Sequence, residues 1–489
     1  MLRDIAKGSV WMVAIRLAER GLGIVSTLLL ARFLVPGDFG LIAMAMSVIV
    51  TLELFSVFSF DVTLIQARSP GRPQYDTAFT LNVLFRSGIA VAMVLVAIPA
   101  ASFYEEPRLT GVLWGLSLGW AAQAFENIAT VNFRRDMQFD REFWFQTVKR
   151  LVSFVVTVAL AVVCRSYWAL VAGMLVGRVT GLVMSYALVP YRPAFTLVAW
   201  RELMSFSSWL MVNNILYVIN TRFSAFIVGK LSGSHALGLY NISREIGTLP
   251  TSELLAPIER ALLPGYSRMA NDPSKLRDGF LVVLSTVSLL TLPAAFGIAA
   301  VAEPLVVNML SRTWVEAIPI LQILSFLGAA SALTANTYPT YVSLGRPQIT
   351  TYLAMARLAI IVPCMFILVR SLGAVGAAWA ELGAALITLP VGWYVLSRVL
   401  EIPLSMFADH LWRPLLSSLC MFVAVREYLD AVTGHMPAEA SLMSLLSAVL
   451  VGVLSYGATI VLLWIFSGRP ESAEIRIVRQ MKLLKQVEQ

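Results

Sequence analysis

Charged residues are scarce in this chain of 489 residues. Asp, Glu, Lys and Arg together make up 13% of it, whereas 58% of the residues are hydrophobic. Soluble domains carry about 25% charged residues, so the composition argues against a water-soluble globular fold. The mean hydropathy is +0.77, and apolar runs near or above the roughly 18 residues needed to cross a bilayer recur from end to end. We therefore predict an integral membrane protein.

The residues that most enzymes and metal sites depend on are also rare. The three cysteines, Cys164, Cys364 and Cys420, lie within or beside apolar segments and show neither a disulfide pattern nor metal-ligand spacing. The three histidines fall in expected loops, and no HExxH or GxxxxGK[ST] motif occurs. No long loop is available for a soluble catalytic domain. The sequence thus predicts a carrier without a metal or other cofactor, and not an enzyme.

Apolar segments separated by charged, proline or glycine residues predict about fourteen transmembrane helices. They are expected near residues 9–34, 39–66, 77–103, 109–132, 142–164, 168–190, 202–229, 238–267, 279–302, 315–344, 349–369, 373–397, 411–426 and 441–467. With both termini on one side, the loops on that side hold most of the loop arginines and lysines. Basic loops stay in the cytoplasm, so we expect both termini to be cytoplasmic.

An internal repeat supports this count. Shifting the sequence without gaps from Arg3 to Arg201 pairs RDIAKGSVW with RELMSFSSW, and it pairs Gly40-Leu41 with Gly238-Leu239. The shift equals six predicted spans, which is an even number, so both copies enter the membrane in the same direction. We expect two six-helix lobes, at 1–198 and 199–400, related by a pseudo-twofold axis along the membrane normal. Two additional helices at 401–467 and a basic cytoplasmic tail at 468–489 would follow; the tail would either lie on the inner leaflet or stay solvated.

Charged side chains interrupt the predicted spans. An arginine at the bilayer centre costs roughly 2.5–3.5 kcal/mol even on a lenient scale, so most of these groups must face protein, water or the interface. The guanidinium fork suits phosphate oxygens. The candidate substrate contacts of this kind are Arg16, Arg20, Arg86, Arg222, Arg244 and Arg357. Those with a carboxylate nearby, such as Glu19 or Glu245, could equally be neutralised tethers between helices.

Polar side chains spaced along one helix face predict a wet interior. In the span at 202–229 the candidate substrate contacts are Asn213, Tyr217 and Asn220. In the span at 109–132 the matching residues are Gln123, Asn127 and Thr130. Hydrogen bonds between helices would explain the same spacing. The carboxylates proposed for ion coupling are Glu53, Asp61 and Glu381.

The segment ARFLVPGDFGL, from Ala31 to Leu41, resembles the opening of the polysaccharide flippases. These form the lipopolysaccharide and exopolysaccharide branch of the multidrug/oligosaccharidyl-lipid/polysaccharide exporter superfamily. The pattern R-x-L-x-P-x-[DE]-[FY]-G is matched by Arg32, Leu34, Pro36, Asp38, Phe39 and Gly40. Shorter similarities are FRRDMQF, LGLY, LLPGYS and SLGRP, at 133–139, 237–240, 262–267 and 343–347. The resemblance implies a fourteen-helix fold with two six-helix lobes around a central cavity lined by basic side chains.

The resemblance also implies a function. Such a flippase would move undecaprenyl-pyrophosphate-linked repeat units from the inner to the outer leaflet of a bacterial inner membrane, by alternating access, for surface or exopolysaccharide synthesis. The implied partners are the lipid-linked oligosaccharide, membrane lipids and, as further candidates, a polysaccharide polymerase or other assembly proteins. The net charge of +8 is attributed to loops facing anionic lipid, and not to nucleic acid.

The alternative is a cation-coupled multidrug or small-molecule exporter of the same superfamily. Such a carrier needs carboxylates to hold cationic substrates, for which Glu53, Asp61 and Glu126 would be available. Basic side chains outnumber acidic ones within the predicted spans, which favours the flippase.

Overall fold

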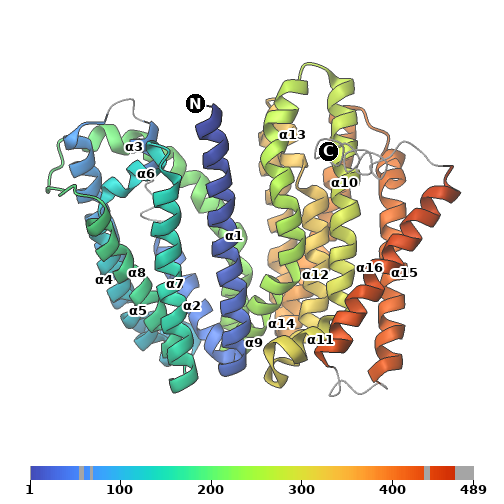
Figure 1. Ribbon diagram of the computed structural model, residues 1–489, viewed down its shortest axis with the longest axis horizontal. Coiled ribbons are helices and arrows are strands. Elements are labelled where there is room, and N and C mark those ends of the chain that lie inside the picture. The colour runs from blue at the N-terminus through green and yellow to red at the C-terminus, as the bar shows by residue number, and fades with distance from the viewer. Residues whose placement is uncertain (1, 54–59, 67–69, 434–440, 469–489) are drawn as a thin grey trace. The chain divides into compact units, whose positions relative to one another are not determined.

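The computed structural model describes residues 2–53, 60–66, 70–433 and 441–468, with the side chains of 2–10, 12, 13, 62, 66, 202–221 and 433 left aside. Within these ranges the chain is helical and contains no strand (Figure 1). The chain divides into two compact units, unit 1 at Met1–Gly238 and unit 2 at Leu239–Gln489. The predicted all-α membrane fold is confirmed. The predicted tail lies outside the described residues from 469 onward.

Unit 1 is built from long helices joined by short turns. Its helices are α1 (Leu2–Phe33), α2 (Pro36–Glu53), α3 (Phe60–Gln66), α4 (Arg72–Tyr104), α5 (Arg108–Ala124), η2 (Ile128–Val131), α6 (Asn132–Arg135), α7 (Phe139–Cys164), α8 (Trp168–Leu188) and the first part of α9 (Trp200–Met269). Small residues let α7 and α8 approach closely: Gly173 and Gly177 face α7, and Ser153 donates a hydrogen bond to the Gly173 carbonyl at 2.8 Å. This close packing positions the polar residues of α7 described below.

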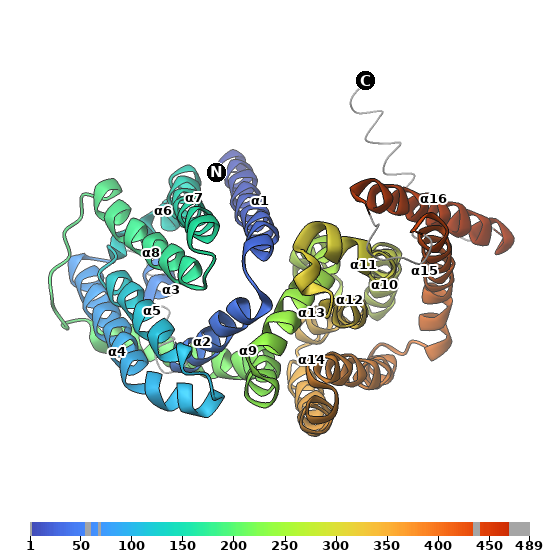
Figure 2. The same ribbon diagram turned by 90° about the horizontal axis from the view of Figure 1, so that it is seen from below.

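Unit 2 is also built from long helices joined by short turns. It contains the rest of α9 and α10 (Pro273–Ala300), α11 (Ala302–Leu305), η3 (Val306–Leu310), η4 (Arg312–Trp314), α12 (Ala317–Thr334), α13 (Thr337–Ser343), α14 (Gln348–Leu400), α15 (Leu404–Thr433) and α16 (Leu442–Phe466). Seen end-on, α10 lies between α12 and α15, and α16 packs against α15 (Figure 2). Phe407 stacks on Trp393 and meets the edge of Phe280 in the core of this unit.

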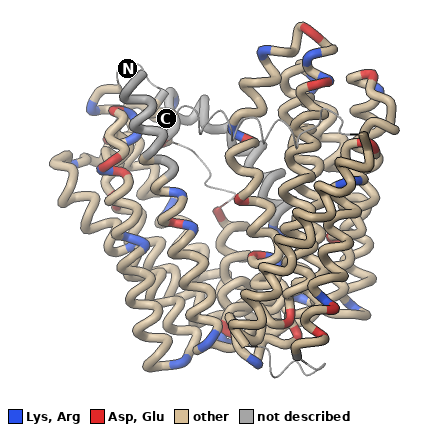
Figure 3. Tube along the Cα trace, turned by 45° about the vertical axis from the view of Figure 1, so that its right-hand side comes forward, with Lys and Arg blue, Asp and Glu red and all other residues tan. Residues whose placement is uncertain are grey.

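Within the described residues each predicted span overlaps a helix, although α5 ends at Ala124, well before the predicted end of its span at 132. Two spans are present in each of α9 and α14, because both helices are broken at a glycine with positive φ, Gly233 (79°) and Gly373 (59°). The pairs α2 with α3 and α12 with α13 each occupy one predicted span. Eight helical stretches of the described chain, α14 counted once, are long and apolar enough to cross a membrane. Charged residues gather toward the helix ends, and fewer lie along the helices (Figure 3).

Two segments that the sequence shift pairs with each other, around Gly40 and around Gly238, are in contact inside unit 1. A side chain on Gly40 would overlap the backbone carbonyl of Ser234. A side chain on Gly238 would overlap the backbone carbonyl of Pro36. The shift that pairs Gly40 with Gly238 also pairs Pro36 with Ser234, so the two contacts are reciprocal. This reciprocity is what a local twofold axis between the two segments requires.

Polar contacts from the α4–α5 turn hold this junction. Lys230 lies 2.8 Å from a carboxylate oxygen of Glu105, and Ser234 donates to Glu106 at 2.9 Å. Arg108 donates two hydrogen bonds to Glu106, at 2.8 and 2.9 Å, and these hold the pKa of that carboxyl below its usual value. The break in α9 is therefore tied to its neighbours by charged hydrogen bonds as well as by close backbone packing.

Candidate functional site

Two adjoining cavities lie among the helices of unit 1. The first cavity has a volume of about 310 Å³, and the second about 490 Å³. They share Gln123, Glu126, Gln146 and Lys149 in their linings. Volumes of roughly 300–1,000 Å³ are typical of small-molecule sites. Unlike most such sites, these cavities carry many charged side chains, although the helices around them are apolar.

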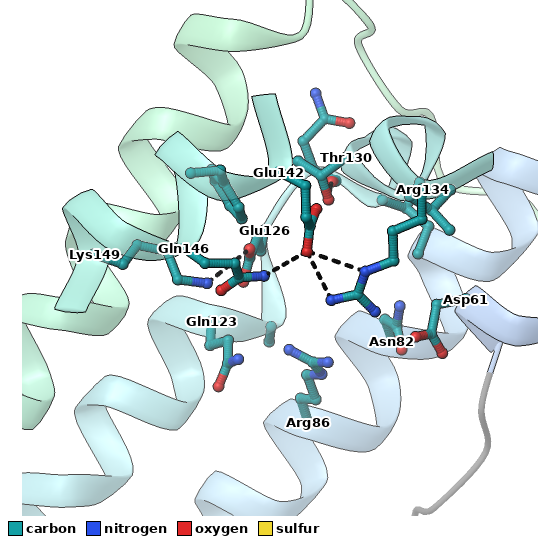
Figure 4. Close-up of a pocket in the computed structure, with 15 residues that line it drawn as sticks. Asp61, Asn82, Arg86, Gln123, Glu126, Thr130, Arg134, Glu142, Gln146 and Lys149 are labelled. Atoms are coloured by element: carbon teal, nitrogen blue, oxygen red, sulfur yellow. Dashed lines mark hydrogen bonds and ion pairs between the residues drawn. The ribbon is translucent and has the colours of Figure 1, made fainter. Parts of the chain in front are cut away.

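One part of the first cavity is held together by ion pairs, and we call it the paired half (Figure 4). The Glu142 carboxylate is buried and accepts hydrogen bonds from Arg134 at 2.7 and 3.0 Å and from Gln146 at 2.9 Å. The Lys149 ammonium lies 3.8 Å from Glu126. α7 supplies Glu142, Gln146 and Lys149 at helical spacings of four and three, so they share one face. These interactions fix the wall of the cavity.

The other part, the open half, is formed by Asp61 of α3, Asn82 and Arg86 of α4, and Gln123 of α5. Among the described residues, these four side chains make no hydrogen bond or ion pair with one another or with their surroundings. Figure 4 shows them together below the paired half. A guanidinium and two amides supply donors, and a carboxylate with the amide oxygens supplies acceptors. The open half can therefore bind a ligand rich in hydrogen-bonding groups.

The second cavity places further charges beside α1 and α8. Arg150 lies 3.2 Å from Glu19 of α1. The Arg178 guanidinium carbon lies 3.3 Å from the centre of the Trp120 ring, a cation–π contact, and Trp120 donates to Glu53 at 3.0 Å. Sequence reasoning gave Arg178 no role, because its partners come from α5 and α2. Glu53, a candidate for ion coupling, is therefore held by a hydrogen bond from the Trp120 ring.

The structure places the sequence candidates of unit 1 in different environments. Arg86 and Asp61 line the first cavity. Arg16 and Arg20 lie on α1, three residues before Glu19 and Gly23, which line the second cavity. Residues three apart share a helix face, so the two arginines continue this stripe. Arg222 is exposed on α9. The side chains of Asn213, Tyr217 and Asn220 lie outside the described residues.

The polar residues predicted to share one helix face at 109–132, Gln123, Asn127 and Thr130, all line the first cavity, but they do not share one helix face. Helix α5 ends at Ala124, so the later residues do not share its face. Asn127 is buried and donates to the Tyr191 carbonyl at 2.8 Å, while its side-chain oxygen caps η2. Thr130 donates to the Asn127 carbonyl. These hydrogen bonds stabilise the chain where the helix is interrupted between α5 and α7, so they have a structural role.

In unit 2, two sequence candidates form a single ion pair. Arg244 of α9 lies 2.7 Å from Glu381 of α14 and donates to the Tyr240 hydroxyl at 3.2 Å. The pairing crosses between helices and does not use the adjacent Glu245. Glu381 is only 2% exposed. Arg357 is half-buried on α14. Arg244, a candidate substrate contact, and Glu381, a candidate for ion coupling, are therefore paired with each other in this unit.

Replacing Glu142 by glutamine should lower the free energy of unfolding by about 1–2 kcal/mol, because the charge that Arg134 and Gln146 bind is lost while their geometry is kept. The loss stays moderate because half of the Arg134 side chain is exposed, at 50%, and can be hydrated. Denaturant unfolding of the purified protein measures it. Glu259→Gln, at an exposed position of α9, is the matched control. Equal stability of the two variants would show that the paired half does not depend on the Glu142 charge.

Three comparisons relate the chain to known proteins. A family model described as polysaccharide biosynthesis protein matches residues 29–319. The lipopolysaccharide biosynthesis protein WzxC of Escherichia coli is 24% identical over 421 residues, covering 84% of this chain and 85% of the relative. The succinoglycan biosynthesis transport protein ExoT of Rhizobium meliloti is 23% identical over 472 residues, covering 94% and 93%.

Solved structures share the fold. The lipid II flippase MurJ, in an inward closed conformation, superposes with a TM-score of 0.71 at 14% identity, covering 95% of this chain and all of that one (100%). An inward-facing multidrug resistance transporter of the MATE family superposes with a TM-score of 0.52 at 12% identity, covering 78% and 94%. At these identities the likeness concerns the architecture alone.

Proposed function

Because this chain belongs to the polysaccharide biosynthesis protein family, we propose that it is a flippase for lipid-linked oligosaccharide repeat units. The membership confirms the resemblance seen in the Arg32–Gly40 motif. In the proposed cycle, an undecaprenyl-pyrophosphate-linked unit enters from the cytoplasmic leaflet of a bacterial inner membrane and leaves in the outer leaflet. The chain would act as a carrier and not as an enzyme, and polymerase or other assembly proteins would use what it delivers.

The observation that carries this proposal is a pair of charged cavities inside an apolar helix bundle. A lipid-linked glycan has a head that hydrocarbon does not solvate, so its passage needs polar groups within the membrane. The paired and open halves provide such groups. Figure 1 shows α3 and α6, which border the first cavity, at the same end of unit 1 as the start of α1. With the proposed cytoplasmic termini, this is the end at which substrate is loaded.

In the proposed mechanism the arginines bind the substrate and the two lobes move. The diphosphate would be contacted by Arg16 and Arg20, which lie on the face of α1 that borders the second cavity. The diphosphate or the glycan would be contacted by the other candidates, which are Arg86, Arg222, Arg244, Arg357, Asn213, Tyr217 and Asn220. The lobes at 1–198 and 199–400 would rock against each other, with 401–467 as an appendage. Glu53, Asp61 and Glu381 would couple transport to an ion. The break at Gly233 supplies a bend between the two halves of α9.

Single alanine replacements of the six arginines should include at least two severe losses of polymer export at normal protein levels, because an interaction with a charged ligand is worth more than a neutral hydrogen bond. Export is measured by complementation of a deletion strain, with protein levels read from membranes. Arg398→Ala is the control, because Arg398 is exposed and bonds only to Tyr394 of its own helix among the described residues. Uniformly mild effects would refute the assigned roles.

The deletion strain itself tests the function. A flippase defect should make lipid-linked oligosaccharide accumulate on the cytoplasmic face of the inner membrane. An exporter of cationic drugs would leave that pool unchanged when deleted and would instead raise drug sensitivity. The absence of accumulation would therefore overturn the proposed function, whatever the arginine variants do.

A further inference from the structure

The first cavity is electrically balanced, which limits what it can bind. Its cations are Arg86, Arg134 and Lys149, and its carboxylates are Asp61, Glu126 and Glu142. A diphosphate entering it would meet as many carboxylates as cations. Like charges repel strongly where water is largely displaced by protein, so this cavity is a poor host for the diphosphate. An uncharged ligand meets no such penalty.

The open half offers the bonding pattern that a sugar requires. Each hydroxyl of a sugar both donates and accepts hydrogen bonds. Arg86, Asn82 and Gln123 can donate, and Asp61 with the two amide oxygens can accept. Among the described residues these side chains bond to nothing else, so a ligand would not have to displace internal hydrogen bonds. Binding would cost little rearrangement of the protein.

Recognition here would rest on hydrogen bonds and not on aromatic stacking. Phe145 is the aromatic side chain in the lining of the first cavity, and the Lys149 ammonium lies 4.5 Å from the centre of its ring. That face is therefore already occupied by a cation. The volume of about 310 Å³ is at the lower end of the range for small-molecule sites, so it suits a small part of a glycan and not a whole repeat unit.

We propose that the open half of the first cavity, formed by Asp61, Asn82, Arg86 and Gln123, is a subsite for an uncharged sugar of the lipid-linked substrate, and that the diphosphate binds elsewhere. This inference rests on the proposed flippase function and refines it. It assigns Arg86 to the glycan, and it adds two amide residues, Asn82 and Gln123, to the substrate contacts.

The test measures binding of the sugar and binding of the lipid diphosphate separately. The first probe is the free oligosaccharide released by mild acid from the lipid-linked intermediate of the deletion strain; the second is undecaprenyl diphosphate without sugar. Both are titrated calorimetrically into the purified full-length chain. Asn82→Ala and Gln123→Ala should each weaken oligosaccharide binding by about three- to tenfold, the value of one or two side-chain hydrogen bonds, and leave undecaprenyl diphosphate binding unchanged. Gln322→Ala, an amide of α12 in unit 2, is the control and should change neither.

The binding measurements test the sugar subsite, and the deletion strain tests the flippase function. Equal oligosaccharide affinity in wild type and both amide variants would overturn the subsite, as would a matched loss of undecaprenyl diphosphate affinity. If Asn82→Ala does not yield folded protein, Gln123→Ala carries the test, because Gln123 is half-buried near the end of α5. Failure of the intermediate to accumulate would refute the flippase function. Accumulation without a change in binding would refute the subsite alone.

Discussion

Replacing Gly40 by alanine should leave little folded protein in the membrane. The added methyl group would overlap the Ser234 carbonyl and crowd the Gly238 amide nitrogen, and both are backbone atoms that cannot rotate away. Overpacking a core costs typically 1–3 kcal/mol and sometimes more, and here only a backbone shift relieves it. We therefore expect a loss of about 3 kcal/mol or more, a large share of the roughly 5–15 kcal/mol that stabilises a folded protein.

The same loop provides the control. A methyl group on Gly37 would lie 3.9 Å from the Ser234 hydroxyl, an ordinary contact, so Gly37→Ala should behave as wild type. Gly238→Ala should reproduce the Gly40→Ala defect, because the two contacts are reciprocal. Membrane levels and the thermal midpoint of the solubilised protein measure the effect. If Gly40→Ala and Gly37→Ala were equally stable, the junction would not be as closely packed as the structure shows.

The second large effect is expected at Arg244. Its replacement by alanine leaves the buried Glu381 carboxylate without the guanidinium that lies 2.7 Å away. Breaking a buried ion pair from one side typically costs 3–5 kcal/mol, because the remaining charge is not solvated. We expect Arg244→Ala to lose about 3–5 kcal/mol in denaturant unfolding. Glu381→Ala should lose less, because the Arg244 side chain is 34% exposed and can be hydrated.

A double replacement distinguishes stability from function at this pair. Arg244→Met with Glu381→Leu removes both charges and keeps the volume, which is often neutral or stabilising for buried pairs. This variant should be about as stable as wild type. Under the proposed function it should nevertheless fail in polymer export, because it lacks both a substrate contact and an ion-coupling group. A stable double variant with normal export would restrict the pair to a structural role. A double variant as unstable as Arg244→Ala would contradict the account of the ion pair.

Much of the fold could be predicted because its determinants are local. A run of apolar residues long enough to cross a bilayer can be recognised in the sequence itself, so a multi-pass helical fold could be predicted without any knowledge of contacts. The repeat was predicted in the same way, from a constant shift that pairs Pro36 and Gly40 with Ser234 and Gly238. What the shift does not reveal is that these four residues touch. Their contact depends on how the break at Gly233 redirects α9.

The candidate site was only partly predictable. Arg86 was selected because no carboxylate lies near it in the sequence, and the structure places it in the open half. Asn82 was missed, because a single amide in an apolar helix gives no periodic signal. The partners of charged residues were missed as well: Glu19 meets Arg150 of α7, and Arg244 meets Glu381 of α14. Local spacing had favoured neighbours in the same helix for both.

The sequence alone determined that this protein is a multi-pass helical membrane protein, because hydrophobic length and charge distribution act on each segment separately. Only the tertiary structure decided which charges neutralise one another and which line a cavity. An ion pair between helices depends on side-chain positions to within a few ångströms, and those positions are set by the packing of the whole unit. For this reason the paired half and the open half, which contain the same kinds of residue, could be told apart only in the folded chain.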